Sequence, residues 1–162
     1  MNVSFHELTG IALAAEAAGR PGARARTWAV TGLLAVAAHG VLDALPHYYP
    51  LPPWADTVVS LALVGGALAL APRGTRLPMF LVCVAALLPD IIDHAPDDLR
   101  KHLGIPFPQV PNLFPWHWPR GSGSWRGRTG PDWLISWVNH GIVIAFCAAA
   151  ILRNRQVWRR RS

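Results

Sequence analysis

Residues 77–94 read LPMFLVCVAALLPDIIDH, and this stretch decides how the rest of the chain is interpreted. Its first part, residues 77–92, is an apolar run that is long enough for a helix crossing most of a bilayer. Four further apolar runs accompany it, at residues 3–19, 28–45, 54–71 and 133–152. Together they predict an all-α fold, an integral membrane bundle of about five transmembrane helices.

The composition agrees with a lipid-facing surface. Only 15% of the 162 residues are charged, whereas soluble domains usually carry about 25%. The mean hydropathy is positive, at +0.26. Runs of this length also occur in soluble all-α bundles, but the scarcity of charge between them favours a membrane protein.

The basic residues lie where topology signals lie. Lys and Arg number 15 against 9 Asp and Glu, and all but one of the basic residues are Arg. They sit in short flanks of the apolar runs, so no nucleic-acid partner is expected. Cys83 and Cys147 fall inside apolar runs and are interpreted as packing residues.

Proline and glycine divide the chain into helices and joints. Residues 1–152 are predicted to be a single transmembrane domain with one long outer loop at 95–131. Residues 153–162 form a basic tail, which is predicted to be cytoplasmic. Arginines between runs one and two, between runs three and four, and after run five share one side if all five runs span. The positive-inside rule then places the N-terminus outside a bacterial-type plasma (inner) membrane that the chain crosses several times.

Histidines and acids gather at the opposite, outer side in this topology. His39 and Asp43 are four residues apart and share one helix face. Asp90 precedes Asp93 and His94 by three and four residues, which again favours one face. An ionisable group inside a membrane is costly unless it is paired or hydrated, so a polar cluster there favours a functional site.

This mixture of imidazole and carboxylate groups is typical of a site for a divalent transition metal, most often Zn²⁺, with one or two ions. The predicted ligands are His6, His39, Asp43, His47, Asp90, Asp93 and His94. Asp93 and His140 are the candidate catalytic residues. Each histidine alone is more often a packing residue than a ligand. Asp56 and Asp132 are interpreted as helix N-caps.

Three sequence elements carry a resemblance to a known family. They are Phe5-His6 followed by Gly10, His39-x3-Asp43 with Pro46-His47, and Pro89-Asp90 through Asp93-His94. With these the chain resembles the predicted membrane-bound metal-dependent hydrolases, grouped with the LexA-binding inner-membrane hydrolase-like proteins. The second element also resembles zinc-dependent phospholipase C motifs. The family's Arg-Gly-x-x-His-Ser element is not matched, which leaves His117 or His140 for the last ligand.

The resemblance and the cluster together imply a metal-dependent hydrolase that cleaves an ester or phosphoester at the outer interface. Membrane lipids are the expected partners, and a lipid or lipid-linked molecule is the expected substrate. Trp116-His117-Trp118 in the long loop is predicted to be a lid or a headgroup contact. Arg120, Arg126 and Arg128 are predicted to contact anionic lipid headgroups or a substrate phosphate. No oligomeric state is predicted.

Three rival functions use the same residues. A metal or proton transporter needs polar groups at the midplane and on the inner side as well. Haem binding can use His39, His94 and His140 as axial ligands. A non-catalytic membrane subunit keeps the cluster as a structural network.

Overall fold

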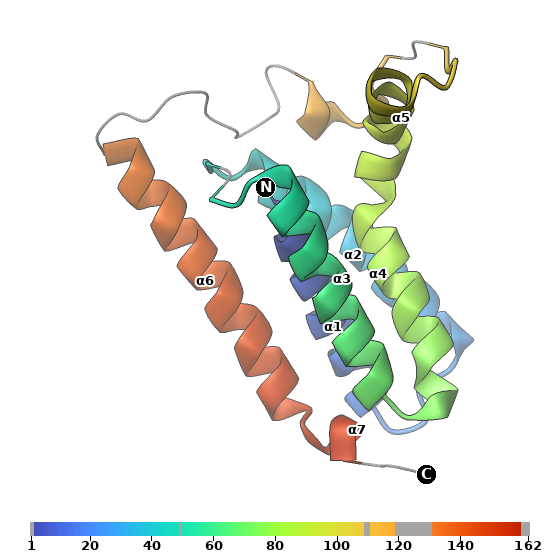
Figure 1. Cartoon of the computed structure of the whole chain (residues 1–162). Helices are drawn as coiled ribbons and strands as arrows, with labels where there is room; N and C mark the ends of the chain where they lie inside the picture. Colours follow the sequence, from blue (N-terminus) through green and yellow to red (C-terminus); the bar gives the residue numbers. More distant parts are fainter. Residues whose placement is uncertain (1, 49, 109–110, 119–130, 160–162) are drawn as a thin grey trace.

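The computed structural model describes residues 2–48, 50–108, 111–118 and 131–159. Over these residues the chain forms seven α-helices, one 3-10 turn and no strand. The long helices run side by side as a bundle (Figure 1). The elements are α1 Val3–Gly19, α2 Ala25–Ala44, α3 Pro53–Leu70, α4 Arg73–Asp93, α5 Ala95–Leu103, η1 Pro115–His117, α6 Pro131–Arg153 and α7 Gln156–Arg159.

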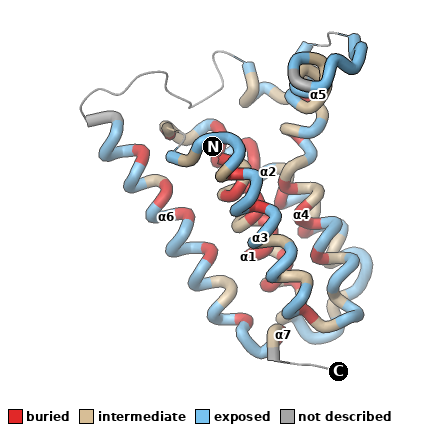
Figure 2. The backbone as a smooth tube through the Cα atoms, in the orientation of Figure 1, coloured by how far each residue is buried: buried red, intermediate tan, exposed pale blue. Residues whose placement is uncertain are grey.

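The five longest helices coincide with the five predicted runs, so the prediction of an all-α membrane bundle is confirmed. Four of them, α2, α3, α4 and α6, are long and apolar enough to cross a membrane. Their outward faces are exposed along most of their length (Figure 2). Those faces carry large apolar side chains such as Leu33 and Phe146, which are 72% and 78% exposed. Such surfaces need lipid rather than water as their solvent.

Helix α1 is the centre of the bundle. It packs against α2, α3, α4 and α6, and most of its residues are buried. Its small side chains allow close approach: a Cβ on Gly10 would lie 3.1 Å from the Cβ of Ala86 on α4. At 17 residues α1 is also the shortest of the five long helices.

The start of α1 is held by an acid from α3. Asp56 accepts hydrogen bonds from the backbone N–H groups of Val3 (2.7 Å) and Ser4 (3.0 Å). The first N–H groups of a helix lack intrahelical partners, so a carboxylate there stabilises the helix. Asp56 was predicted to cap its own helix, and that is wrong: α3 begins at Pro53, with Pro52 as its N-cap. The predicted N-cap Asp132 lies outside the described side chains.

The segment predicted as a long loop at 95–131 contains two helical pieces. Helix α5 has Pro96 and two acids in its first turn and ends at Gly104, whose φ of 65° is left-handed. Glycine adopts that conformation readily, which suits the end of a helix. The turn η1 follows at Pro115–His117. The predicted tail at 153–162 is partly helical as well, because α6 reaches Arg153 and α7 follows.

The two ends of the bundle differ in chemistry. Near one end, Arg20, Trp28, Gly74 and Gln156 line a common hollow. There Arg153 and Asn154 both donate hydrogen bonds to Glu16. The described arginines that flank the apolar runs therefore lie at this end, and the histidines and acids of the motifs lie at the other, beside α5 and η1 (Figure 1).

Candidate metal centre

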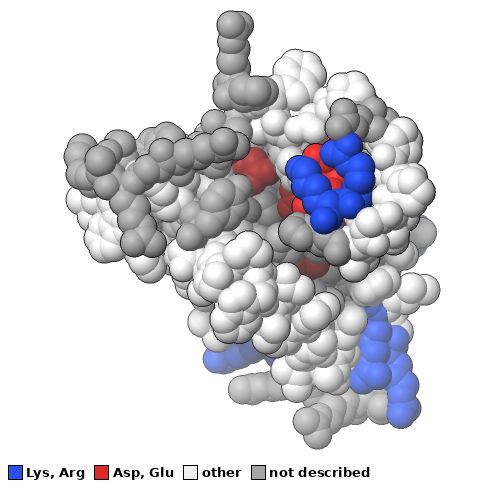
Figure 3. Space-filling view, turned by 45° about the horizontal axis from the view of Figure 1, so that its top comes forward, with Lys and Arg blue, Asp and Glu red and all other residues white. Residues whose placement is uncertain are grey.

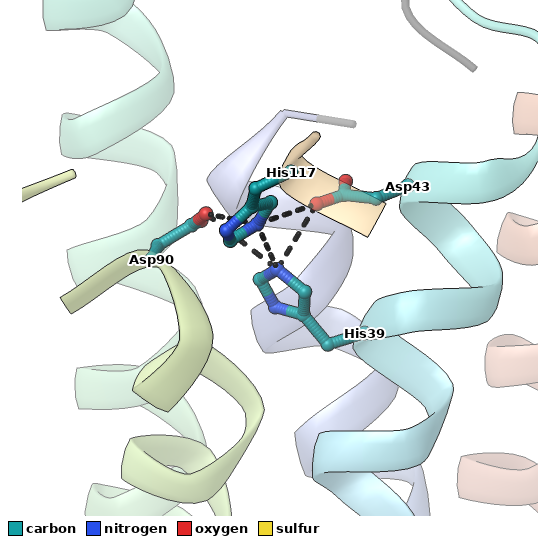
Figure 4. Close-up of side chains that lie close together, drawn as sticks. All are labelled: His39, Asp43, Asp90 and His117. Atoms are coloured by element: carbon teal, nitrogen blue, oxygen red, sulfur yellow. Dashed lines mark hydrogen bonds and ion pairs between the residues drawn. The ribbon is translucent and has the colours of Figure 1, made fainter. Parts of the chain in front are cut away.

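Four side chains from three elements converge at the end of the bundle near η1. His39 and Asp43 come from the last turns of α2, Asp90 from the end of α4 and His117 from η1 (Figure 4). Each offers one ligand atom, and these four atoms lie within 4.8 Å of one another. The side chains of His39 and His117 are 0% and 3% exposed.

Five of the six distances between these ligand atoms are close to those of a tetrahedral site. Nε2 of His39 lies 3.1 Å from Oδ2 of Asp43 and 3.5 Å from Oδ1 of Asp90. Nε2 of His117 lies 3.1 Å and 3.3 Å from the same two oxygens, and the two Nε2 atoms are 3.4 Å apart. Ligand atoms about 2.0–2.1 Å from a central Zn²⁺ are about 3.3 Å apart in a regular tetrahedron. The residues present therefore fit a metal ion of this kind.

Hydrogen bonds behind the two imidazoles direct their lone pairs inward. Nδ1 of His39 lies 2.6 Å from the carbonyl oxygen of Ala86, which can only accept. Nδ1 of His117 lies 2.8 Å from Oδ2 of Asp93. Both Nδ1 atoms therefore donate, and both Nε2 atoms are left to bind a cation or a proton. This arrangement of a ligand histidine and an outer acceptor recurs in metal sites.

Pro89 of α4 lies one turn after Ala86 and directly before Asp90. A proline inside a helix has no N–H to donate and its ring crowds the carbonyl four residues earlier, which is Ala85 here. The Ala85 carbonyl, which lacks this N–H donor, lies one residue before Ala86, whose carbonyl accepts from His39, and Asp90 follows Pro89 directly. Helix α4 nonetheless continues to Asp93.

Asp93 fastens η1 to the end of α4. Its carboxylate accepts from the backbone N–H groups of Leu113 (2.8 Å) and Phe114 (3.0 Å), and from Nδ1 of His117. Burial by itself lowers the pKa of His117, but hydrogen bonds to Asp43, Asp90 and Asp93 outweigh it and raise that pKa to about 10. With no metal bound, His117 is thus a protonated imidazole among three carboxylates.

The site opens to the surface on the side of Asp90 and His94. Their side chains are 23% and 50% exposed, and Nε2 of His94 lies 3.9 Å from Oδ1 of Asp90. The rings of His94 and His117 are 4.4 Å apart. Arg100 and Lys101 pair with Asp97 on the nearby helix α5. They form a small charged patch among mostly uncharged atoms on this end of the molecule (Figure 3).

Trp116 covers the site from η1. A Cβ on Gly40 of α2 would lie 2.6 Å from Cε3 of Trp116, closer than such atoms can approach. The absence of a side chain at Gly40 therefore lets the indole lie directly on α2. This contact helps to place the neighbouring His117.

Three further predicted histidines are buried, and one of them, His6, contacts Asp43. The ring of His6 stacks on that of His39 at 3.7 Å, and its Nε2 lies 3.1 Å from Oδ1 of Asp43. His47 and His140 are 0% and 3% exposed. Burial lowers the pKa of His47 to about 4, so this imidazole is neutral at physiological pH.

Three of the four converging residues, His39, Asp43 and Asp90, were among the predicted metal ligands. His117 was placed in a lid or left as an alternative last ligand, although it is a central member of this group. Asp93, predicted as a ligand and a catalytic group, lies outside these four and accepts hydrogen bonds from η1 and His117. His6, His47, His94 and His140 surround the group without belonging to it. Arg120, Arg126 and Arg128 lie outside the described residues.

No protein-family model, curated protein or solved structure matches the chain. The resemblance carried by the three motifs therefore remains a prediction.

Proposed function

We propose that the protein is a membrane-embedded, metal-dependent hydrolase that acts on an ester or phosphoester of a lipid or lipid-linked substrate. The observation that carries this proposal is the set of four inward-facing ligand atoms with mutual distances suited to a tetrahedral ion. A divalent metal bound there supplies a water of lowered pKa and a Lewis acid for the substrate oxygen. Zn²⁺ is the proposed ion, because two imidazoles and two carboxylates suit it.

The chain's own residues divide the work. His39, Asp43, Asp90 and His117 hold the ion. His94 is the best-placed proton acceptor, since it is half exposed and lies beside Asp90 at the mouth. Asp93 is a positioning residue, because its carboxylate is already engaged by three donors.

The position of the site suits a substrate in the membrane. It lies at one end of the bundle, beneath α5 and η1, where apolar side chains such as Leu103, Leu113 and Trp118 are at least half exposed. Trp and Leu side chains of this kind lie favourably at a membrane interface. With the arginine-rich end in the cytoplasm, the site belongs to the outer leaflet of a bacterial-type plasma membrane.

The rival functions fit less well. At the opposite end, Glu16 is bonded to Arg153 and Asn154, so these groups support packing rather than a transport path. For haem, the carboxylates of Asp43 and Asp90 lie within hydrogen-bonding range of His39 and occupy the space that a porphyrin ring needs. An enzyme site open to one side is the better explanation.

The test is the metal content of detergent-purified protein, measured by inductively coupled plasma mass spectrometry. We expect one or two equivalents of a transition metal in the wild type, and a loss in the variant that combines His39→Gln with Asp90→Asn. Asp98→Asn is the matched control, because Asp98 is an exposed acid of α5. A wild type that binds no metal after reconstitution with Zn²⁺ would sink the proposal.

A metal-loaded protein is then tested for hydrolysis of p-nitrophenyl esters, bis-p-nitrophenyl phosphate and phospholipid vesicles. We expect turnover that a chelator abolishes and Zn²⁺ restores. Full metal occupancy with no turnover of any ester would favour a non-catalytic metal-binding subunit.

A further inference from the structure

A hollow of about 370 Å³ lies at the arginine-rich end of the bundle, where α7 closes the fold (Figure 1). Its walls come from α1, α2, α4, α7 and the residues that join α1 to α2. Arg20, Trp28, Thr75 and Gln156 are among the side chains that line it. Binding sites for small molecules usually measure about 300–1,000 Å³, so the hollow has room for a small polar group such as a lipid headgroup.

Tertiary contacts hold the walls of this hollow together. Glu16, near the end of α1, accepts hydrogen bonds from Arg153 and Asn154 at the joint between α6 and α7. A Cβ on Gly19 would overlap Oδ1 of Asn154, so the glycine lets this joint lie directly against the end of α1. Val157 of α7 follows and is only 5% exposed. The hollow is therefore bounded by packed elements.

The charge at this end is positive. Arginine is the only charged residue type in residues 20–27, 71–76 and 153–159, which flank the apolar runs here. Arg76 donates to the carbonyl oxygens of Ala71 and Ala69 at the end of α3. Arg20 lines the hollow and forms no ion pair with another described residue. A guanidinium without a carboxylate partner is suited to bind a phosphate, whose oxygens match its paired N–H groups.

The other lining groups suit the same ligand. No Asp or Glu is among the described residues that line the hollow, so nothing there repels an anion. The side-chain amide of Gln156 can donate to a phosphate oxygen. The ring of Trp28 packs against the buried core beside the hollow, and tryptophan is typical of the level at which lipid headgroups meet the apolar core of a membrane.

The position of the hollow along the helices favours a lipid as the source of the phosphate. Two of the candidate spans, α2 and α4, begin here, so the hollow lies where the helices enter the membrane. Val30 and Leu77, two residues beyond Trp28 and Thr75, are 47% and 66% exposed. They offer an apolar surface to acyl chains close to the hollow, which a soluble phosphate compound does not use. Basic pockets beside transmembrane helices bind anionic headgroups in this way.

We propose that this hollow binds the headgroup of an anionic phospholipid, with Arg20 and Gln156 holding its phosphate and Trp28 beside it. The lipid belongs to the leaflet at the arginine-rich end, which by the positive-inside rule is the cytoplasmic one. The site lies at the opposite end of the bundle from the metal centre and does not depend on the proposed hydrolase function.

The test is native mass spectrometry of full-length protein in detergent with equal amounts of phosphatidylglycerol and phosphatidylcholine. The wild type should retain phosphatidylglycerol preferentially. Arg20→Gln should lower its affinity for that lipid about fivefold, since one arginine near a membrane surface contributes about that factor. Arg26→Gln is the matched control, because Arg26 is an exposed arginine of α2 that does not line the hollow, and it should leave the preference unchanged.

Two results would overturn the proposal directly. Equal retention of the two lipids by the wild type would show that the hollow does not select an anion. Equal losses in Arg20→Gln and Arg26→Gln would mean that a diffuse basic surface, rather than the hollow, attracts the lipid. If Arg20→Gln does not fold, Gly74→Phe takes its place. An added Cβ on Gly74 meets no atom within 4 Å, so the phenyl ring fills space in the hollow at constant charge and should weaken binding; unchanged binding would refute the site.

Two further arms identify the ligand and separate this site from the metal centre. An excess of inorganic phosphate should leave the bound lipid in place, and displacement of the lipid would show that the hollow takes soluble phosphate instead. The variant that combines His39→Gln with Asp90→Asn should retain phosphatidylglycerol as the wild type does. Loss of the lipid from that variant would place it at the metal centre, which overturns the present proposal and supports the proposed hydrolase.

Discussion

Replacement of Asp93 by Asn tests whether η1 is fastened to the metal site as described. The carboxylate accepts from two backbone N–H groups and from Nδ1 of His117, at 2.8–3.0 Å. An Asn side chain has one acceptor oxygen and an amide group that can only donate. At least one of the three donors then loses its acceptor, and the charge that strengthens these bonds is removed.

The magnitude follows from the role of Asp93 behind a ligand. Loss of an outer-shell partner typically weakens metal binding by about 10- to 100-fold, which corresponds to about 1.4–2.8 kcal/mol. We expect Asp93→Asn to weaken Zn²⁺ binding within this range, measured by competition with a chromophoric chelator. Hydrogen exchange of residues 111–118 should become faster, because the bonds to Leu113 and Phe114 are broken.

Asp97→Asn is the matched control, since Asp97 is four residues away and pairs only with Arg100 and Lys101 among the contacts described for it. It should leave Zn²⁺ affinity unchanged. Unaltered affinity and unaltered exchange in Asp93→Asn would refute the positioning role. A loss of affinity with unchanged exchange would mean that Asp93 acts on the ion directly.

Three further predictions concern the neighbourhood of the site. Gly40→Ala should displace Trp116 at an overpacking cost of about 1–3 kcal/mol, which lowers Zn²⁺ affinity and shifts tryptophan fluorescence. The control Gly32→Ala, whose added Cβ would have its nearest neighbour at 3.8 Å, should change neither. Asp56→Ala should lower the free energy of unfolding by about 1–2 kcal/mol, seen as a lower thermal midpoint in detergent. The pKa of His117 is raised to about 10, so protonation of His117 stabilises the folded, metal-free protein. This stabilisation is complete below about pH 6.5 and is lost as the pH rises through 10. Because Zn²⁺ displaces the same proton, Zn²⁺ affinity should rise about tenfold per pH unit between pH 6 and 8. A pH-independent Zn²⁺ affinity would contradict the assignment of His117 as a ligand.

Local periodicity is why three of the four converging residues were predictable. His39 and Asp43 are one helical turn apart, and Asp90 ends an apolar run, so their common depth follows from helix geometry and the arginine flanks. The five long helices were predictable for the same reason, because each is a continuous apolar run.

His117 was harder to predict because tertiary contacts place it. Its position depends on hydrogen bonds that the backbone N–H groups of Leu113 and Phe114 donate to Asp93, and on the close approach of Trp116 to Gly40. Neither contact leaves a periodic pattern in a proline-rich segment. The flanking tryptophans were the available signal, and they were interpreted as a lid.

Asp56 shows how a local rule can be satisfied elsewhere in the fold. An acid near the start of a helix usually interacts with that helix's own N–H groups. Here Pro53 starts the helix earlier, and the carboxylate reaches the first residues of α1 instead. Only the parallel arrangement of α1 and α3 makes that partner available.

The central position of α1 constrains the order in which the protein is assembled. Among the five long helices α1 is synthesised first, and the helices that enclose it, α2, α3, α4 and α6, all follow it along the chain. Its buried face, with His6 and Glu7, has no complete lining until α6 has entered the membrane. The first of these helices to be synthesised is therefore the last to reach its final packing, and the surroundings of His6 are completed only after α6 has been added.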